Sequence, residues 1–273
     1  MTFQEATKTF EFDESLLAGH LGLRFPIHKQ IVGTSVTADA DGNKAFTAGY
    51  WATDAGRLYP ADKATIAGTA VTVQNAQLFA VGEVISTLYP TDRAVFAGNW
   101  AAGDSVSITL DGSTKSLLLS AATDAATAAT ELATLINADA FFSKKVAAVA
   151  DGVDLFLYSV DGAPYAYAMT ETTAGTGTIT GDAVALAIQT IGTITAIDTA
   201  TNVITLGANA WVDVIGVPVG VAGLKVDGIL LTGIDLNRES SQVGLCVSAS
   251  LVGARLPYWD AYLANQFPEI KII

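Results

Sequence analysis

The sequence has few of the residues on which metal sites, disulfide frameworks and nucleic-acid interfaces depend. Its 273 residues include one cysteine and two histidines, and 14 basic residues stand against 27 acidic ones. A single thiol cannot form an intrachain disulfide, which excludes the small disulfide-stapled scaffolds of secreted proteins. The scattered lysines and arginines and the net charge of -13 argue against binding to a nucleic-acid backbone or an anionic membrane, because clustered basic side chains recognise both.

Charge of either sign and long apolar runs are also scarce. Charged residues make up only 15% of the chain and apolar residues 51%, so much of the polarity comes from Thr, Ser, Asn and Gly. No apolar run is long enough to span a membrane, and the acidic N-terminal stretch lacks the apolar core of a signal peptide. We therefore expect a protein that is made in a cytoplasm, stays soluble until it is assembled, and has much of its surface covered in that assembly.

Catalytic constellations are missing from the sequence as well. It contains no nucleophile elbow, zinc-protease helix or phosphate-binding loop. Cys246 lies in an apolar run and is interpreted as a small buried hydrophobe. Asp151 and Asp154 could imitate the carboxylate pair of a glycosidase, but they lie at a predicted turn and are interpreted as turn residues. With His20 and His28 as the only imidazoles, no cofactor or metal site can be assembled, and we expect that the chain is not an enzyme.

Two further patterns have both a functional and a structural interpretation. Residues 39–43 resemble the start of a calcium loop, but Lys44 stands where that loop needs Gly and Tyr50 where it needs Glu, which favours a hairpin turn. A set of aromatic residues would suit a sugar-binding surface, although packing in a core or a subunit interface is favoured. These aromatic residues are Trp51, Tyr59, Trp100, Tyr165, Tyr167, Tyr258 and Trp259.

Period-2 alternation of apolar and polar residues predicts a mainly β fold of the α+β class. One segment breaks it: residues 121–138 carry apolar residues at helical spacing, which predicts an amphipathic helix capped by Ser120 or Thr123. A second, short helix is predicted at residues 258–265. Four strand pairs are predicted, three of them joined by turns that begin at Asp: 106–110 with 115–119, 145–150 with 153–160, 192–197 with 203–206, and 228–231 with 243–251.

The order of these patterns predicts nested insertion of one domain into another. Residues 26–68 and 218–273 are assigned to an outer β domain, which is interrupted by a small β-barrel formed from residues 69–92 and 190–217. Residues 93–189 form a β-β-α-β-β unit inserted into that barrel, because insertion is tolerated where the ends of a domain lie close together. Residues 1–25 are set apart as an N-terminal arm.

Several short motifs resemble the phage head-decoration proteins of the lambda type. In that family a G-I-L … D-V-D strand precedes a strand that ends in a small-residue turn and L-P. Here the corresponding stretches are DGILLTGID at 227–235 and CVSASLVGARLP at 246–257, while FTAG at 46–49 and LYP at 58–60 fit the first half of the family. The barrel segments and the inserted unit are similar to modules that recur in phage structural proteins.

The resemblance implies a virion structural protein with a small β-barrel or β-tulip-like decoration domain. Such a protein binds the major capsid protein on the outer capsid surface, as a homotrimer that cements neighbouring capsomers, and is assembled in the host cytoplasm. It uses no cofactor, and neither nucleic acid nor a membrane is its partner. The alternative is a head-fibre or tail adhesin that binds a host receptor or a glycan through the inserted unit.

The N-terminal segment alternates Phe10 and Phe12 with polar residues. This pattern fits either an ordinary first strand or an arm that adds to the sheet edge of another chain. The resemblance implies the arm, which pairs with strands of the capsid protein. On that interpretation the capsid-contact residues are Phe3, Phe10, Phe12, Leu16 and Leu17.

Overall fold

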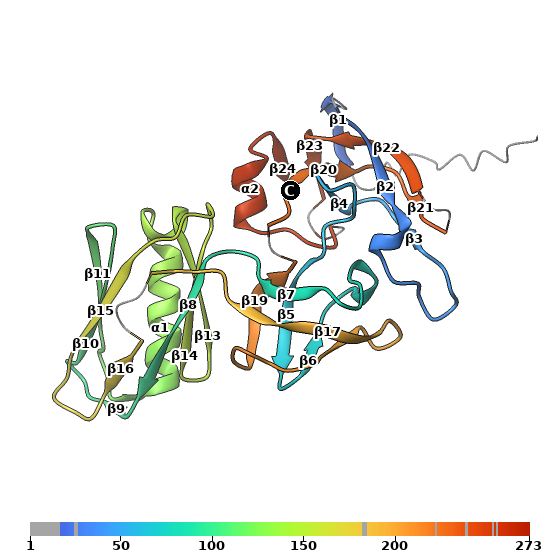
Figure 1. Cartoon of the computed structure of the whole chain (residues 1–273). Coiled ribbons are helices and arrows are strands. Elements are labelled where there is room, and N and C mark those ends of the chain that lie inside the picture. Colours follow the sequence, from blue (N-terminus) through green and yellow to red (C-terminus); the bar gives the residue numbers. More distant parts are fainter. Residues whose placement is uncertain are drawn as a thin grey trace, which may run out of the picture.

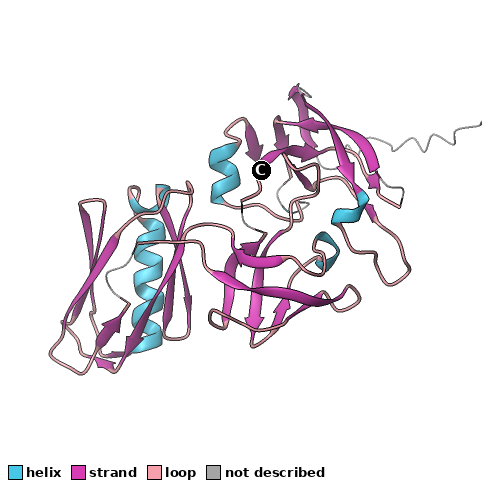
Figure 2. Ribbon diagram, viewed as in Figure 1, coloured by secondary structure: helices cyan, strands magenta, loops and turns pink. Residues whose placement is uncertain are grey.

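The chain forms three parts, a central unit, a barrel and an outer part, which Figure 1 shows side by side. The computed structural model describes residues 17–24, 27–181, 185–221, 223–237, 240–252, 254 and 256–273. Strands dominate these residues, and their two α-helices lie in the central unit and in the outer part (Figure 2). The expected mainly β fold is confirmed.

The barrel is a closed sheet of six strands in the order β17-β18-β6-β5-β19-β7. Its interior is filled by alternate side chains such as Ile66, Val71 and Ile204, which are at most 2% exposed, because successive strand residues face opposite sides. Only glycine fits at Gly192, where a Cβ would lie 2.2 Å from the Ala208 carbonyl oxygen. The strands are β5 (Ala61–Ala67), β6 (Ala70–Thr72), β7 (Val84–Thr87), β17 (Thr190–Asp198), β18 (Val203–Leu206) and β19 (Val214–Gly220).

The extent of the barrel differs from the predicted one. Strands from residues 69–92 and 190–217 form it, as expected, but β5 also belongs to it and β19 continues to Gly220. The sequence pattern assigned β5 to the outer domain because alternation identifies a strand without identifying its partners. Pairing of β5 with both β6 and β19 closes the sheet. Whether the three parts fold separately stays a prediction.

The central unit packs one helix between two sheets. The helix α1 (Ala125–Ala138) buries Ala128, Ala129, Leu132 and Ile136, and its small alanines allow a close approach to the strands. The core residues of this unit all lie between positions 94 and 186. One sheet has the order β13-β14-β8-β16 and the other β11-β10-β15, with a β12-β9 pair at one end. The strands are β8 (Thr91–Ala97), β9 (Asn99–Trp100), β10 (Ser105–Leu110), β11 (Ser113–Leu118), β12 (Thr123–Asp124), β13 (Val146–Asp151), β14 (Asp154–Ser159), β15 (Tyr167–Thr172) and β16 (Thr178–Thr180).

The helix start was placed too early by the sequence pattern. The cap is Asp124, whose Oδ1 accepts a hydrogen bond from the Thr127 amide at 2.7 Å, so the predicted caps Ser120 and Thr123 are wrong. Thr123 instead belongs to β12, where it pairs with Trp100. A carboxylate at this position both satisfies a free amide and complements the helix dipole.

The predicted hairpins are confirmed. β10 pairs with β11 across Asp111 and Gly112, which have φ values of 49° and 76°, as a two-residue turn with positive φ requires. β13 pairs with β14 and β17 with β18. The fourth predicted pair is observed as β20 with β22, but its second segment is divided, since residues 248–251 form a separate strand of another sheet.

The outer part consists of three small sheets and one short helix. The sheet orders are β2-β22-β20-β4, β1-β23-β24 and β21-β3. Its core is continuous with the barrel interior, because Ile31, Phe46 and Leu245 belong to the same apolar cluster as the barrel residues. The short predicted helix is confirmed as α2 (Ala261–Gln266). The strands are β1 (Leu17–Arg24), β2 (Ile27–Val32), β3 (Ala45–Phe46), β4 (Trp51–Thr53), β20 (Val226–Leu230), β21 (Ile234–Asp235), β22 (Ser240–Cys246), β23 (Ser248–Leu251) and β24 (Ile270–Ile272).

The chain enters and leaves the central unit through two segments that pair with each other. The Thr87 amide donates to the Gln189 carbonyl at 2.8 Å, and Thr91 and Ala187 exchange two backbone hydrogen bonds at 2.7 and 3.3 Å. The Gln189 side chain donates to the Thr91 carbonyl at 2.9 Å. The two connections are therefore held side by side, which is the geometry that an insertion requires.

The central unit also contacts the barrel directly. The Ile215 amide of β19 donates to a carboxylate oxygen of Asp151 at 2.9 Å. The Phe156 ring stands edge-on to Trp211, with ring centroids 5.5 Å apart. An aromatic pair in this geometry contributes about 0.5–1.5 kcal/mol beyond its buried area. The central unit is therefore docked on the barrel rather than only tethered to it.

We expect residues 90–189 to fold without the remainder of the chain, because their main apolar cluster lies entirely between positions 94 and 186, and of their fully buried side chains only Phe156 packs in the barrel cluster. The isolated segment should melt cooperatively in a thermal scan followed by circular dichroism. Leu132→Ala, which empties a fully buried position of α1, should cost about 2–5 kcal/mol both in the isolated segment and in the full chain. An isolated segment that lacks a cooperative transition would contradict this prediction.

Candidate functional site

The N-terminal segment is the first candidate contact region from the sequence, and most of it lies outside the described residues. This holds for Phe3, Phe10, Phe12 and Leu16. Leu17 is the first residue of β1 and pairs with Leu251 of β23 in the same chain. Residues 17–24 of the predicted arm are thus an internal strand, and the arm hypothesis is restricted to residues 1–16.

The segments that resemble decoration proteins lie together in the outer part. Ile234 of β21 pairs with Phe46 of β3, although these residues are far apart in the sequence. Ile229 of β20 pairs with Trp51 of β4 on one side and with Cys246 of β22 on the other. The motifs from the first and last portions of the chain therefore form one β body.

A buried carboxylate organises the tyrosines beside α2. Asp260, the N-cap of α2, accepts hydrogen bonds from the hydroxyls of Tyr89 and Tyr258 and, at 2.9 Å, from the Leu263 amide. Burial raises the pKa of both tyrosines, and the nearby Asp260 charge raises it further. Tyr89 lies in the connection to the central unit and Tyr258 in the C-terminal segment. The network therefore fixes α2 against this connection.

An aromatic stack covers the adjacent surface. The Trp51 and Trp259 rings lie 5.5 Å apart at an interplanar angle of 22°, and Trp51 Nε1 donates to the Tyr258 carbonyl at 2.9 Å. Most of the aromatic residues noted from the sequence are core residues, as the favoured interpretation expected: Trp51, Tyr59, Trp100, Tyr167 and Tyr258 are buried. Only Tyr165 and Trp259 of that set are partly exposed.

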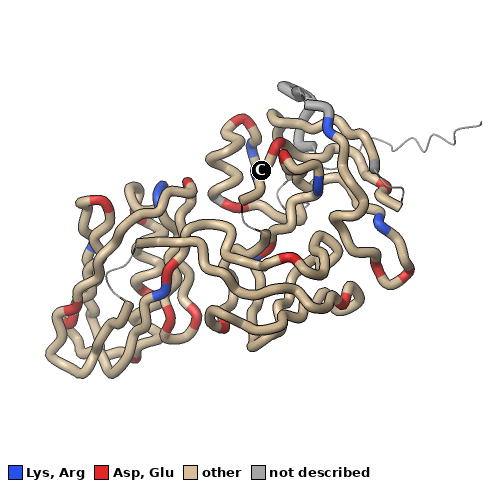
Figure 3. Tube along the Cα trace, in the orientation of Figure 1, with Lys and Arg blue, Asp and Glu red and all other residues tan. Residues whose placement is uncertain are grey.

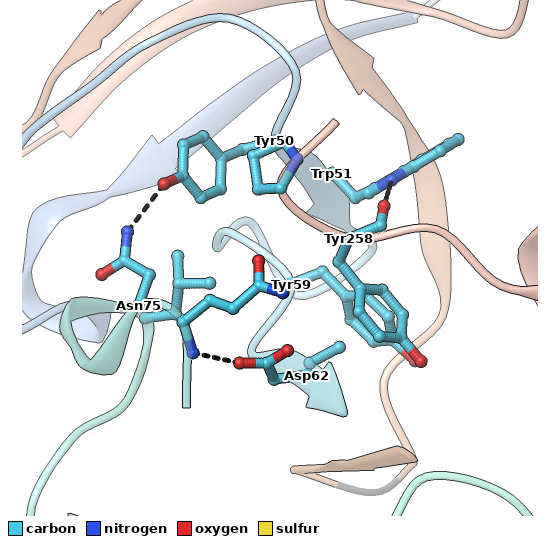
Figure 4. A pocket seen from close by; sticks show the side chains of 10 residues that line it. Tyr50, Trp51, Tyr59, Asp62, Asn75 and Tyr258 are labelled. Carbon is cyan, nitrogen blue, oxygen red and sulfur yellow. Dashed lines mark hydrogen bonds between the residues drawn. The ribbon is translucent and has the colours of Figure 1, made fainter. Parts of the chain in front are cut away.

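A second buried carboxylate, Asp62, lies where the barrel meets the outer part (Figure 4). It is 3% exposed and accepts hydrogen bonds from the Gln74 amide and, at 2.7 Å, from the Lys63 amide. Burial raises the pKa of Asp62, and the two amide hydrogen bonds oppose this shift. Beside it, the Asn75 side chain donates to the Tyr50 hydroxyl at 2.7 Å.

A groove opens next to Asp62. It has a volume of about 350 Å³ and runs between β5 and the segment before α2. It adjoins the smaller cavity of Figure 4, with which it shares Asp62, Gln74, Pro257 and Tyr258. Lys63 and Gln74 are exposed, and Trp259 is partly exposed. Sequence reasoning identified Trp259 and Tyr258 but missed the polar residues, because their patterns are those of an ordinary barrel strand and loop.

The remaining sequence candidates have structural roles. Asp39 accepts hydrogen bonds from the amides of Asp41 and Asn43 at 3.0 and 2.7 Å, which confirms the turn. Asp154 forms an ion pair with Arg93 at 3.0 Å. Asp151 accepts the hydrogen bond from the Ile215 amide of the barrel strand β19. Cys246 is fully buried, as expected.

The described residues form neither a metal-binding cluster nor a membrane-spanning helix. Within residues 17–24 and 27–273, less the short gaps given above, no three or more His, Cys, Asp or Glu side chains are grouped so that they could hold a metal ion. No helix in the described part of the chain is long and apolar enough to cross a membrane. The structure describes the backbone of His20 and His28 but not their side chains.

Comparison with known proteins does not assign the chain to a family. No protein-family model matches it, and no curated protein matches it. A solved chain from Mycobacterium phage Patience is 12% identical, and the match covers 81% of this chain and 98% of that chain with a TM-score of 0.21. A likeness this low supports no argument about fold or function, so the function rests on the residues themselves.

The buried tyrosines predict a loss of stability at alkaline pH. Burial raises the pKa of Tyr158 to about 12, whereas an unfolded tyrosine has a pKa of about 10. Above pH 10 the unfolded chain therefore releases a proton that the folded chain retains, and the free energy of unfolding falls as the pH rises. Urea titrations at pH 7, 9 and 11 should show this fall.

Tyr158→Phe should remove its share of this pH dependence, up to about 2 kcal/mol between pH 9 and 12. Tyr165→Phe is the comparison variant and should have a smaller effect, because this side chain is more exposed and the Lys145 ammonium opposes the rise in the pKa of Tyr165 that burial and Asp161 cause. An alkaline fall that is as steep in Tyr158→Phe as in the unchanged protein would refute the assignment.

Proposed function

We propose that this protein is a structural component of a tailed-phage virion that binds the outer capsid surface as a homotrimer and stabilises neighbouring capsomers. The single observation that carries the proposal is the joining of the decoration-like motifs in one β body. The motifs come from residues 46–60 and 227–257, and strand pairs β3-β21 and β4-β20 bring them together. Motifs that matched by chance would have no reason to pair with each other, as the strands do here in two neighbouring sheets.

The neutral faces of the sheets support a role in an assembly. On the outward face of the β11-β10-β15 sheet, the Ser107 and Ser116 hydroxyls lie 2.7 Å apart and those of Thr109 and Thr114 lie 2.8 Å apart. No outward residue of these three strands is charged, and Leu118 at the edge is 68% exposed. Figure 3 shows the charged residues of the described chain scattered along the whole trace. Uncharged surface of this kind costs little to desolvate at a contact.

The capsid-binding element in this proposal is the segment of residues 1–16. An extended arm gains affinity from main-chain hydrogen bonds to an exposed sheet edge and specificity from alternate side chains. Phe10 and Phe12 supply these side chains. The arm would leave the body at Leu17, where β1 joins β23, so its removal spares that strand pair. The chain has no enzymatic activity in this proposal, and its partners are the major capsid protein and two further copies of itself.

The second candidate function, an adhesin of a head fibre or tail, makes a different demand on the chain. It needs a receptor site on the central unit, and a tail adhesin, unlike a head fibre, needs no contact with the capsid. The capsid-binding experiment therefore separates the decoration protein from a tail adhesin.

Deleting residues 1–16 should abolish co-sedimentation with capsids that lack the protein, while the melting temperature of the free protein stays almost unchanged. The double variant Phe10→Ala, Phe12→Ala should weaken binding less, because the backbone hydrogen bonds survive. A variant with residues 1–16 in scrambled order is the matched control: it keeps the main-chain donors and acceptors but loses the alternate positions of Phe10 and Phe12, so it should bind no better than the double variant. Full binding by the deletion variant would contradict the arm's role, and absence of binding by the unchanged protein would contradict the capsid function.

Sedimentation equilibrium should give a mass three times the 28.2 kDa of one chain, either in free solution or after release from capsids. A three-fold ring would bury two different patches of each subunit, because its contacts are heterologous and close after three copies. A monomer in both preparations, at all concentrations, would contradict the homotrimer.

A further inference from the structure

The groove beside Asp62 has the volume of a small-ligand site and a mixed polar and aromatic lining. Its volume of about 350 Å³ lies within the range of about 300–1,000 Å³ typical of such sites. One wall belongs to the barrel and carries Asp62 and Lys63 of β5 and Gln74. The other wall is the segment Leu256-Pro257-Tyr258-Trp259 before α2. Neither the capsid arm nor the neutral sheet face uses this groove.

The aromatic wall is fixed before any ligand arrives. One face of the Trp259 indole is stacked on Trp51, which in turn is held by its hydrogen bond to the Tyr258 carbonyl. Asp260, the residue after Trp259, is itself held in place by hydrogen bonds that its carboxylate accepts from the Tyr89 and Tyr258 hydroxyls. Trp259 remains partly exposed and lines the groove. It therefore offers a rigid apolar plate, and rigid plates lose little conformational entropy on binding.

The polar wall combines three kinds of hydrogen-bonding group. Each Asp62 carboxylate oxygen accepts one backbone amide and has a further lone pair free for a donor. The exposed Gln74 side chain can both donate and accept, and the exposed Lys63 ammonium donates. Donors and acceptors thus lie within one groove, opposite an aromatic plate.

We propose that this groove binds a neutral glycan. A pyranose ring has an apolar face of C–H groups, which packs on an indole, and an edge of vicinal hydroxyls, each of which donates and accepts. The mixed lining of Asp62, Lys63 and Gln74 matches that edge. A phosphate or an acidic ligand would meet the Asp62 carboxylate, and a purely apolar ligand would leave the polar groups without their hydrogen bonds to water.

This glycan site differs from that of an adhesin with its binding tip on the central unit. The groove lies between the barrel and the outer part, and none of its lining residues belongs to the central unit. The proposal is also independent of the capsid function, because a capsid-bound decoration protein can expose the groove to the outside. Failure of capsid binding leaves the glycan test unaffected, and the reverse also holds.

The test uses the full-length protein and an array of immobilised oligosaccharides. The array carries neutral oligomers of glucose, galactose, mannose and N-acetylhexosamines, together with uronic and sialic acid oligomers. We expect binding to at least one neutral oligomer, and the soluble form of that oligomer should change the tryptophan fluorescence, because it stacks on Trp259. Absence of binding to every neutral oligomer, or binding to acidic oligomers alone, would overturn the proposal.

Variants then locate the bound oligomer. Gln74→Ala and Lys63→Gln alter exposed side chains and should each weaken binding about tenfold, the effect of one lost hydrogen bond. Trp259→Phe keeps an aromatic ring but should abolish the fluorescence change. Gln266→Ala and Lys271→Gln, exposed outside the groove, are matched controls that should bind like the unchanged protein. Equal affinity in all five variants would place the ligand elsewhere and overturn the proposal.

Discussion

Closure of the barrel at β7 is the constraint on which the remaining structure depends. β7 pairs with β17 through Ile85 and Gly192 and with β19 through Thr87 and Val219. These pairings join strands that precede the central unit to strands that follow it, so the chain must return to within hydrogen-bonding distance of the point where it left. A large insertion is compatible with the fold only because both connections meet this condition.

The apolar clusters largely follow the division between the central unit and the rest of the chain. The barrel interior and the outer part share one cluster, in which Ile66 and Val217 of the barrel occur together with Ile31 and Leu245 of the outer sheets. The central unit has its own cluster around α1. A third, aromatic cluster joins Trp51, Tyr89 and Tyr258 across the junction of the parts. Two buried carboxylates also lie at this junction. Asp260 accepts hydrogen bonds from two tyrosine hydroxyls and one backbone amide, and Asp62 accepts hydrogen bonds from two backbone amides.

The two proposals use separate surfaces with different chemistry. The proposed capsid binding would use residues 1–16 and neutral sheet faces rich in Ser and Thr, where Leu118 adds an exposed apolar edge. The proposed glycan binding would use a groove lined by a fixed indole, a carboxylate, an amide and an ammonium group. The net charge of -13 is compatible with both, since neither surface requires clustered basic residues. A virion protein that both cements the shell and holds a sugar needs surfaces that do not overlap.

The sequence alone determined the local structure. Alternation and Asp-Gly turns predicted the hairpins of β10 with β11 and β13 with β14, and the 3.6-residue spacing predicted α1, because these signals depend on neighbours in the chain. It did not determine that β5 closes the barrel or that residues 17–24 are an internal strand, since the partner of a strand is set by long-range register. The groove could not be predicted for the same reason: Asp62 and Trp259 are nearly two hundred positions apart in the sequence, and only the packing of the outer part on the barrel places them on facing walls.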